Sequence, residues 1–303
     1  MISRLIYITI KLVSCIPLPL CRWIGKMLGR FISLFSTRRT QVSLHNIEMC
    51  FGQPLGPKGA KRLNRAVILH FAQMVFEVPH ILNMNKVNLN KYVVFHNEEN
   101  LRNAYKKGKG VFIVTGHFGN WELMAAAISL RFGRLSIVAR PFDFKPLDRV
   151  MVTLRSRFGA EIIPKQKAMR RLLNTIKQKR MVGILLDQNV DWYAGVFVKF
   201  LGEWACTNKG LALLALKTGA PVIPAFCVRQ KDGPYRIYFE DEIRLKKTGD
   251  KTKDVEENTV LFTNVIEYYI RRHPEQWLWF HQRWKTRPYC VLPDMGNEER
   301  SIR

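Results

Sequence analysis

The stretch that decides the fold is Val111-Phe112-Ile113-Val114-Thr115-Gly116-His117-Phe118-Gly119-Asn120-Trp121-Glu122. Its first five residues form an uninterrupted apolar run, which is typical of a strand buried in a parallel sheet. Two glycines permit a tight turn around His117. The segment 121–130, rich in Ala, Leu and Met, then predicts a helix. The sequence therefore predicts a strand, a turn and a helix in direct succession.

The chain around this unit continues to alternate between strand and helix patterns. Further strands are predicted at 135–139, 161–163, 182–186, 222–228 and 235–239, and further helices at 64–84, 147–158, 167–180, 210–217 and 255–272. This alternation predicts an α/β layered domain with a mostly parallel central sheet flanked by helices. We expect this domain to span residues 41–295, between an N-terminal segment 1–40 and a polar tail 296–303.

Residues 1–40 have the composition of a membrane anchor. The apolar run 5–21 is 17 residues long, short of the roughly 20 needed for a straight span, and Lys11 and two prolines interrupt it. Over residues 23–35, apolar positions recur at helical spacing and basic ones share a face, as in a helix lying in an anionic membrane surface. We expect a bent or re-entrant anchor whose flanks face the cytoplasm. The alternative is an amphipathic helix packed on the protein's own core.

The overall charge points to an anionic partner. There are 49 Lys and Arg residues against 24 acids, which gives a net charge of +25. Most of the excess lies in residues 1–76, at +10, and in residues 123–186, at +11. Nucleic acid, anionic lipid, a phosphorylated substrate and an acidic protein all fit this balance. The six cysteines form no CxxC pair and do not cluster with histidines, so no metal site is expected.

His117 is the candidate catalytic residue. It follows a buried strand, where α/β folds place ligand sites, and Gly116 leaves backbone N–H groups exposed beside it. Glu122 lies five residues later, where its carboxylate can fold back onto one imidazole nitrogen and raise the basicity of the other. The alternative is that His117 caps a helix or lies in the core and that Glu122 is a surface acid.

The segment Gly116–Glu122 resembles the His-x4-Asp/Glu motif of glycerolipid-type acyltransferases. Further blocks resemble, in order, the lipid A biosynthesis (lauroyl/myristoyl) acyltransferase family: 138–141, 183–188, 195–202 with Thr207, and 274–288. Together with the N-terminal segment, the resemblance covers nearly the whole chain. It implies a glycerolipid-acyltransferase-like fold.

The resemblance also implies a reaction and a place. A fatty acyl chain would move from acyl carrier protein, or from acyl-CoA, to a hydroxyl of a lipid A precursor, which is a phosphorylated glycolipid. His117 would remove the hydroxyl proton and Glu122 would orient it. No cofactor and no metal are implied. The enzyme would work on the anionic cytoplasmic face of a bacterial inner membrane. Another glycolipid or a lysophospholipid stays open as the acceptor.

The same resemblance implies residues that contact the substrates. Arg140 is the matched cation for a developing oxyanion or a substrate phosphate, and the alternative is a surface arginine that follows a strand. Gly116 and Asn120 belong to the motif itself. Asp187 ends a predicted strand and is interpreted as support for the site, or as a turn cap. Arg283 is either a phosphate contact or part of a solvated tail.

The basic composition is also compatible with two classes of function that are not enzymatic. A nucleic-acid-binding protein could use the basic helix 167–180, but aromatic residues and known reader motifs are missing there, so no nucleic acid is expected as a partner. A non-catalytic protein of anionic membrane surfaces would bind vesicles without turnover.

Overall fold

Strand β2 (Val111–Thr115) lies in the middle of a seven-stranded sheet with the order β1-β9-β8-β2-β5-β3-β4. The computed structural model describes residues 1–164 and 168–289. The other strands are β1 (Val93–His96), β3 (Leu135–Ala139), β4 (Glu161–Pro164), β5 (Met181–Leu185), β8 (Val222–Val228) and β9 (Tyr235–Phe239). Neighbouring strands run parallel except β8 and β9. The mostly parallel sheet predicted from the sequence is confirmed.

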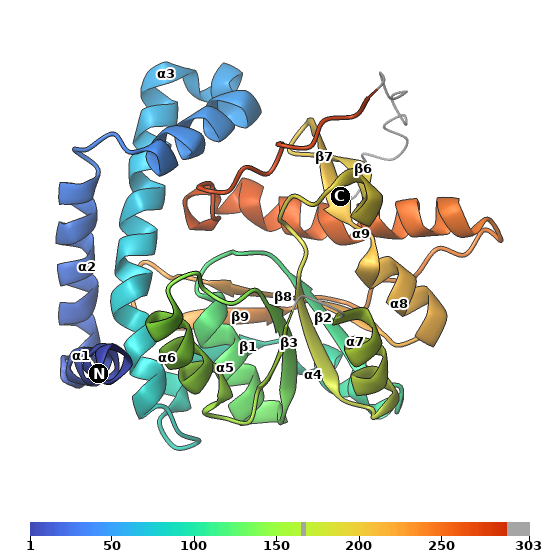
Figure 1. The fold of residues 1–303 in the computed structure, drawn as a ribbon, viewed down its shortest axis with the longest axis horizontal. Coiled ribbons are helices and arrows are strands. Elements are labelled where there is room, and N and C mark those ends of the chain that lie inside the picture. Colours follow the sequence, from blue (N-terminus) through green and yellow to red (C-terminus); the bar gives the residue numbers. More distant parts are fainter. Residues whose placement is uncertain (165–167, 290–303) are drawn as a thin grey trace.

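Helices cover both faces of this sheet (Figure 1). Successive side chains of β2 point to opposite faces, as in any strand. Phe112 and Val114 join a core that includes residues of α8 and α9, whereas Val111 and Ile113 join a core that includes residues of α4 and α5. The helices are α1 (Ile2–Cys15), α2 (Leu18–Ile32), α3 (Arg38–Glu77), α4 (Glu98–Lys106), α5 (Trp121–Phe132), α6 (Lys145–Ser156), α7 (Ala168–Lys177), α8 (Gly210–Thr218) and α9 (Lys251–Arg272).

Several elements differ from the prediction. Helix α3 begins at Arg38 instead of residue 64, because Thr37 and Thr40 form a capping box there. Gly56, at φ +63°, breaks it in the region of Pro54 and Pro57. The two-stranded antiparallel sheet of β6 (Gly195–Phe200) and β7 (Glu203–Asn208) was not predicted, nor was edge strand β1. Each of these strands is only partly buried, and buried and partly buried positions do not alternate regularly along it. The predicted tail 296–303 lies outside the described residues.

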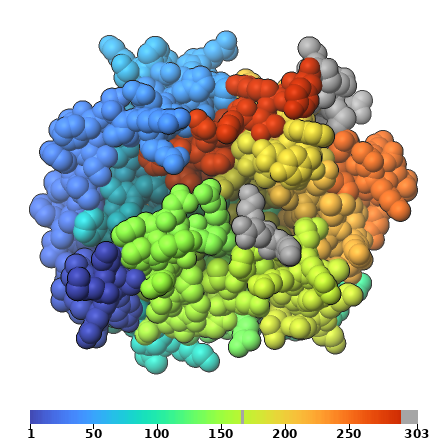
Figure 2. Space-filling view, viewed as in Figure 1, coloured from blue at the N-terminus to red at the C-terminus, as the bar shows by residue number. Residues whose placement is uncertain are grey.

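The N-terminal segment forms two helices along one side of the molecule (Figures 1 and 2). Helices α1 and α2 meet at an angle of 116° beside Pro17, so the expected bend is present. Helix α1 contacts α6, and α2 packs along α3. Their outer faces carry exposed apolar side chains, among them Leu5, Leu12, Trp23 and Phe31. One side of the segment therefore packs on the protein's own core, and the other side remains apolar and exposed.

A further helical stretch, Arg38–Asn83, is long and apolar enough to cross a membrane by composition. Half of its most apolar window is buried inside the protein, as in the core helix of a soluble domain.

Close packing of α2 on α3 depends on glycine. A Cβ atom at Gly25 would lie 2.6 Å from the Cα atom of Gln73, so the helix backbones approach too closely for any side chain there. We expect Gly25→Ala to lower the free energy of unfolding by about 1–3 kcal/mol and to expose the N-terminal helices to proteolysis. Gly52→Ala is the matched control, because nothing lies within 4 Å of that position. Equal stability of the two variants, measured by urea unfolding, would contradict this prediction.

Candidate active site

His117 and Asp187 meet because their strands are neighbours. β2 and β5 run parallel, with Thr115 opposite Leu185, and each candidate lies two residues beyond the end of its strand. The carboxyl ends of parallel strands meet at one edge of the sheet, so the two side chains converge there. The Nδ1 atom of His117 lies 2.8 Å from Oδ1 of Asp187. Asp187, interpreted from the sequence as support for the site, thus touches the imidazole directly.

The Asp187 carboxylate is 3% exposed and fully hydrogen-bonded. Its Oδ2 atom accepts from the backbone N–H of His117 at 2.8 Å and from Nε1–H of Trp277 at 2.7 Å. Gly116 leaves room for it, since a Cβ atom there would lie 3.2 Å from the Asp187 Cγ atom. Burial alone would raise the pKa of Asp187, but the charge of protonated His117 and these hydrogen bonds outweigh it and lower the pKa to about 2.

An ionised Asp187 fixes the tautomer of His117. The carboxylate can only accept, so Nδ1 of the neutral imidazole carries the proton and Nε2 holds the free lone pair. Gln188 donates to Nε2 from 3.3 Å, and the ring of Trp121 packs edge-on with its centroid 5.1 Å away. The His117 side chain is 20% exposed. Nε2 is therefore the basic nitrogen of this pair, and it can act as a general base once a substrate hydroxyl takes the place of the Gln188 amide at its lone pair.

Backbone contacts clamp the turn that carries His117. The carbonyl of His117 accepts from Leu278 N–H at 3.0 Å, and Gly119 N–H donates to the carbonyl of Gln276 at 2.8 Å. Gly119 adopts φ +58°, and a Cβ atom there would lie 1.6 Å from the carbonyl oxygen of Cys227. Only glycine fits at this position. The turn is thus fixed between the end of β8 and the segment that follows α9.

The expected contact of Glu122 with the imidazole is wrong. Asp187 occupies Nδ1, and Glu122 instead forms a two-pronged ion pair with Arg155 of α6, at 2.9 Å to Nε and 2.5 Å to Nη2. Glu122 lies in the first turn of α5, whose direction carries its side chain toward α6. The sequence offered no signal for Arg155, because the pairing depends on how α5 and α6 pack against each other, which the pattern of neither helix shows.

The other predicted site residues are placed differently from one another. Arg140 directly follows β3 at the same edge of the sheet; its side chain is 74% exposed and pairs with Asp143. Asn120 is buried, and its side chain caps α5 by accepting from Leu123 N–H. Arg283 is fully buried and donates to the carbonyl of Cys206 at 2.8 Å and to Thr207. Arg283 is therefore an internal support of the β6–β7 hairpin, which corrects the expectation of a phosphate contact.

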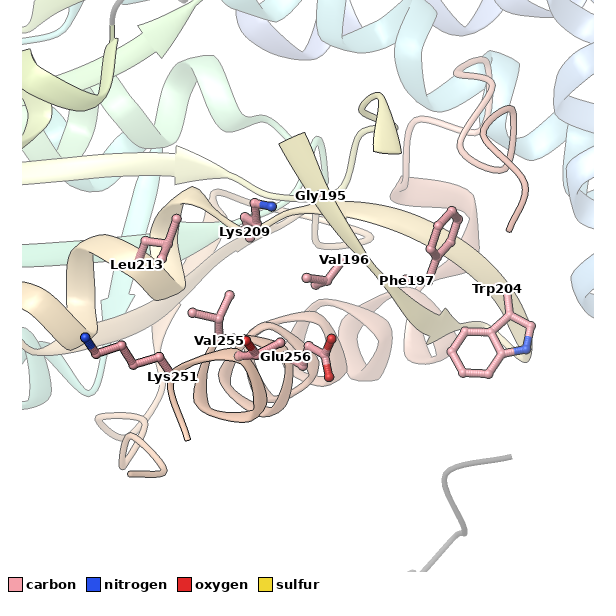
Figure 3. A pocket seen from close by; sticks show the side chains of 10 residues that line it. Gly195, Val196, Phe197, Trp204, Lys209, Leu213, Lys251, Val255 and Glu256 are labelled. Carbon is pink, nitrogen blue, oxygen red and sulfur yellow. The ribbon is translucent and has the colours of Figure 1, made fainter. Parts of the chain in front are cut away.

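A cavity of about 600 Å³ lies between the β6–β7 hairpin and helices α8 and α9 (Figure 3). Apolar side chains line its walls, with Lys209 and Lys251 among the lining residues. Its lining includes neither His117 nor Asp187. The Asp187–His117 pair is therefore not part of this cavity.

The whole domain matches a known family. Residues 1–286 match the model of the bacterial lipid A biosynthesis acyltransferases. The chain belongs to this family. It is 26% identical over 287 residues to the lipid A biosynthesis lauroyltransferase of Escherichia coli (strain K12). The aligned region covers 92% of this chain and 90% of that protein. The chain is 25% identical over 278 residues to the palmitoleoyltransferase of the same organism, covering 90% and 87%.

More distant similarities extend beyond lipid A. The chain is 24% identical over 244 residues to the phosphatidylinositol mannoside acyltransferase of Mycolicibacterium smegmatis, covering 79% of this chain and 75% of that protein. A solved structure, the 1-acyl-sn-glycerophosphate acyltransferase of Thermotoga maritima, aligns with a TM-score of 0.39 and 13% identity, covering 78% of this chain and 97% of that one. Family membership makes the protein an acyltransferase, as the resemblance implied.

The lowered pKa of Asp187 predicts how its contribution to stability changes with pH. The folded pKa is about 2, below the ordinary value of 3.8, so ionised Asp187 stabilises the fold above about pH 4 and this contribution is lost as the pH falls toward 2. Asp187→Asn should therefore destabilise the protein by roughly 2 kcal/mol more at neutral pH than near pH 2, measured by urea unfolding. Asp143→Asn, on an exposed pair, is the control. If Asp187→Asn lowered the free energy of unfolding equally at neutral pH and near pH 2, the lowered pKa of Asp187 would be refuted.

Proposed function

We propose that this acyltransferase moves a fatty acyl chain from a thioester carried by acyl carrier protein to a hydroxyl of a lipid A precursor, with His117 as general base. The observation that carries the proposal is the Asp187–His117 pair, whose geometry leaves Nε2 unprotonated on a His117 side chain that is 20% exposed. Such a pair is the arrangement that orients an imidazole for proton removal from a hydroxyl. The names of the lipid A relatives support the acceptor class.

The reaction follows from this geometry. Nε2 of His117 accepts the proton of the acceptor hydroxyl as its oxygen attacks the thioester carbonyl, forming the new C–O bond. When the tetrahedral intermediate collapses, the C–S bond breaks and the thiolate leaves. The imidazolium then returns the proton to the sulfur. Asp187 stabilises the imidazolium throughout, because it stays ionised beside Nδ1.

Cationic groups at the same edge of the sheet support the binding of anionic substrates. Arg140 is exposed there, and Arg155 is held in place by Glu122. We assign Glu122 to the site through this guanidinium, which it fixes in orientation beside the first turn of α5. Helix α7 adds exposed basic residues that suit an acidic carrier protein.

The N-terminal helices support attachment to the membrane. The outer faces of α1 and α2 are apolar and exposed. On α2 they include Trp23 and Phe31, and basic residues lie between these two positions. The bend at Pro17 suits helices lying in the interface of an anionic inner membrane, on its cytoplasmic face. Residues 1–40 would then be the anchor and 41–295 the acyltransferase domain.

A different glycolipid is the second candidate acceptor. The similarity to a phosphatidylinositol mannoside acyltransferase covers 79% of this chain, so the same residues are compatible with another phosphorylated glycolipid. Both acceptors would require the same proton transfer by His117, so the choice affects the substrate and not the mechanism.

Acyl transfer in vitro tests this proposal. Purified protein is incubated with acyl carrier protein charged with chains of several lengths, or with acyl-CoA, and with a lipid A precursor or a phosphatidylinositol mannoside. We expect His117→Ala and Asp187→Asn to lower kcat by roughly 10²–10⁴-fold while circular dichroism stays unchanged, since both remove an oriented base. Glu242→Gln, which removes a surface acid paired with Lys107, is the control and keeps its activity.

Two outcomes would contradict the proposal. Absence of transfer by the folded wild-type protein to any glycolipid would contradict the reaction. Full activity of His117→Ala would contradict the assignment of the base.

A further inference from the structure

A second pocket lies far from the β6–β7 hairpin, between α2 and the turn that joins β8 to β9. It has a volume of about 380 Å³. The lining residues are Pro19, Arg22, Trp23, Lys26, Gln73, Arg229, Gln230, Lys231, Asp232 and Gly233. Four of them are cations and one is an acid, so the pocket concentrates positive charge. Polar and cationic walls of this kind suit a phosphate group.

The four cations of this pocket divide into two pairs. Arg22 and Arg229 are anchored: both donate to the buried carboxylate of Glu77, Arg22 at 2.7 Å and Arg229 at 2.5 and 2.7 Å. Lys26 and Lys231 form no ion pair within the described residues 1–164 and 168–289. The pocket therefore has two arginines held by Glu77 and two lysines that form no ion pair with Asp232, the acid of its lining.

The position of the pocket indicates where its ligand comes from. Trp23, on the rim, is 58% exposed and belongs to the apolar outer face of α2, and tryptophan prefers the head-group level of a membrane. If α2 lies in the interface, as in the proposed function, the mouth of the pocket is at the depth of the lipid phosphates. A lipid head group is then the anion present at the highest local concentration.

We propose that this pocket binds the phosphate of an anionic phospholipid head group, and that its occupancy stabilises the turn carrying His117. This inference rests on the membrane attachment proposed above. Arg22, Lys26 and Lys231 would surround the phosphate, while the guanidinium of Arg22 keeps its contact with Glu77.

A continuous chain of hydrogen bonds links the pocket to the active site. Nε–H of Arg229 donates to Nδ1 of His70 at 3.1 Å, and Nε2 of His70 lies 3.3 Å from the carbonyl oxygen of Gly119. Arginine can only donate, so Nδ1 of His70 accepts and Nε2 carries the proton that reaches Gly119. Burial, and next the charge of Arg229, lower the pKa of His70 well below its usual range and keep it neutral.

The same arginine also holds the opposite side of the turn. The side-chain amide of Gln276 accepts from the backbone N–H of Arg229 at 2.8 Å and donates to the backbone carbonyl of Arg229 at 3.1 Å. The backbone carbonyl of Gln276 accepts from the backbone N–H of Gly119 at 2.8 Å. Arg229 thus reaches Gly119 through both His70 and Gln276. Glu77 connects this unit to Arg22 on α2. A ligand that further restrains Arg22 is therefore expected to reduce the residual motion of the turn at Gly119, two residues from His117.

Hydrogen exchange tests this coupling without relying on turnover. Wild-type protein is bound to phosphatidylcholine vesicles with or without phosphatidylglycerol, and exchange is compared in residues 116–123 at equal bound fractions. We expect roughly twofold to fivefold slower exchange with the anionic lipid, the size expected of one partly exposed charge contact. The double variant Lys26→Gln, Lys231→Gln should lose this difference. Lys106→Gln, Lys109→Gln, which removes the same charge elsewhere on the surface, should retain it.

The remaining outcomes would overturn the inference. An equal effect of phosphatidylglycerol on both double variants, or no effect on the wild type, would show that the pocket does not transmit lipid binding. Equal slowing of exchange in residues 116–123 by soluble glycerophosphoglycerol, at the same concentration, would show that a soluble phosphodiester is sufficient and that the ligand need not be a lipid. Acyl transfer by the wild-type protein is measured separately, so failure of the coupling and failure of the proposed reaction are distinguishable.

Discussion

The active site depends on the hydrogen bonds that the carboxylate of Asp187 accepts. An ionised carboxylate buried in a domain core is strongly unfavourable unless its oxygens are hydrogen-bonded. Here the imidazole and the backbone N–H of His117, together with the indole of Trp277, donate to it. These contacts hold together the ends of two strands and the segment after α9. The orientation of the His117 imidazole thus arises from the same bonds that stabilise this edge of the sheet.

The turn around His117 is rigid because several elements share it. Gly119 contacts the end of β8 too closely for a side chain, and the carbonyl of His117 is bonded to Leu278. Rigid placement matters for catalysis, since an oriented base must meet the hydroxyl within hydrogen-bond reach. The buried pair of Glu122 and Arg155 adds a second fixed group, from α5 and α6, on the same side of the motif.

Helix α2 packs on the core of the domain with one face and is exposed on the opposite face. Gly25 lets α2 pack tightly on α3, and Arg22 of the same helix reaches the buried Glu77. The opposite face keeps exposed apolar side chains such as Trp23. A helix joined in this way to both the core and an outer surface can transmit a binding event inward, because Glu77 is also bonded to Arg229 near the turn.

The sequence by itself determined the alternation of strands and helices, the strand–turn–helix unit of His117, the bend near Pro17 and the family. These features depend on local hydrophobic pattern, glycine and proline, or on motifs contiguous in the chain. Only the tertiary structure decided that Asp187 and not Glu122 orients His117, and that Arg283 is internal. Those outcomes depend on which strands are neighbours in the sheet, and pairing between distant segments leaves no periodic signal in either one.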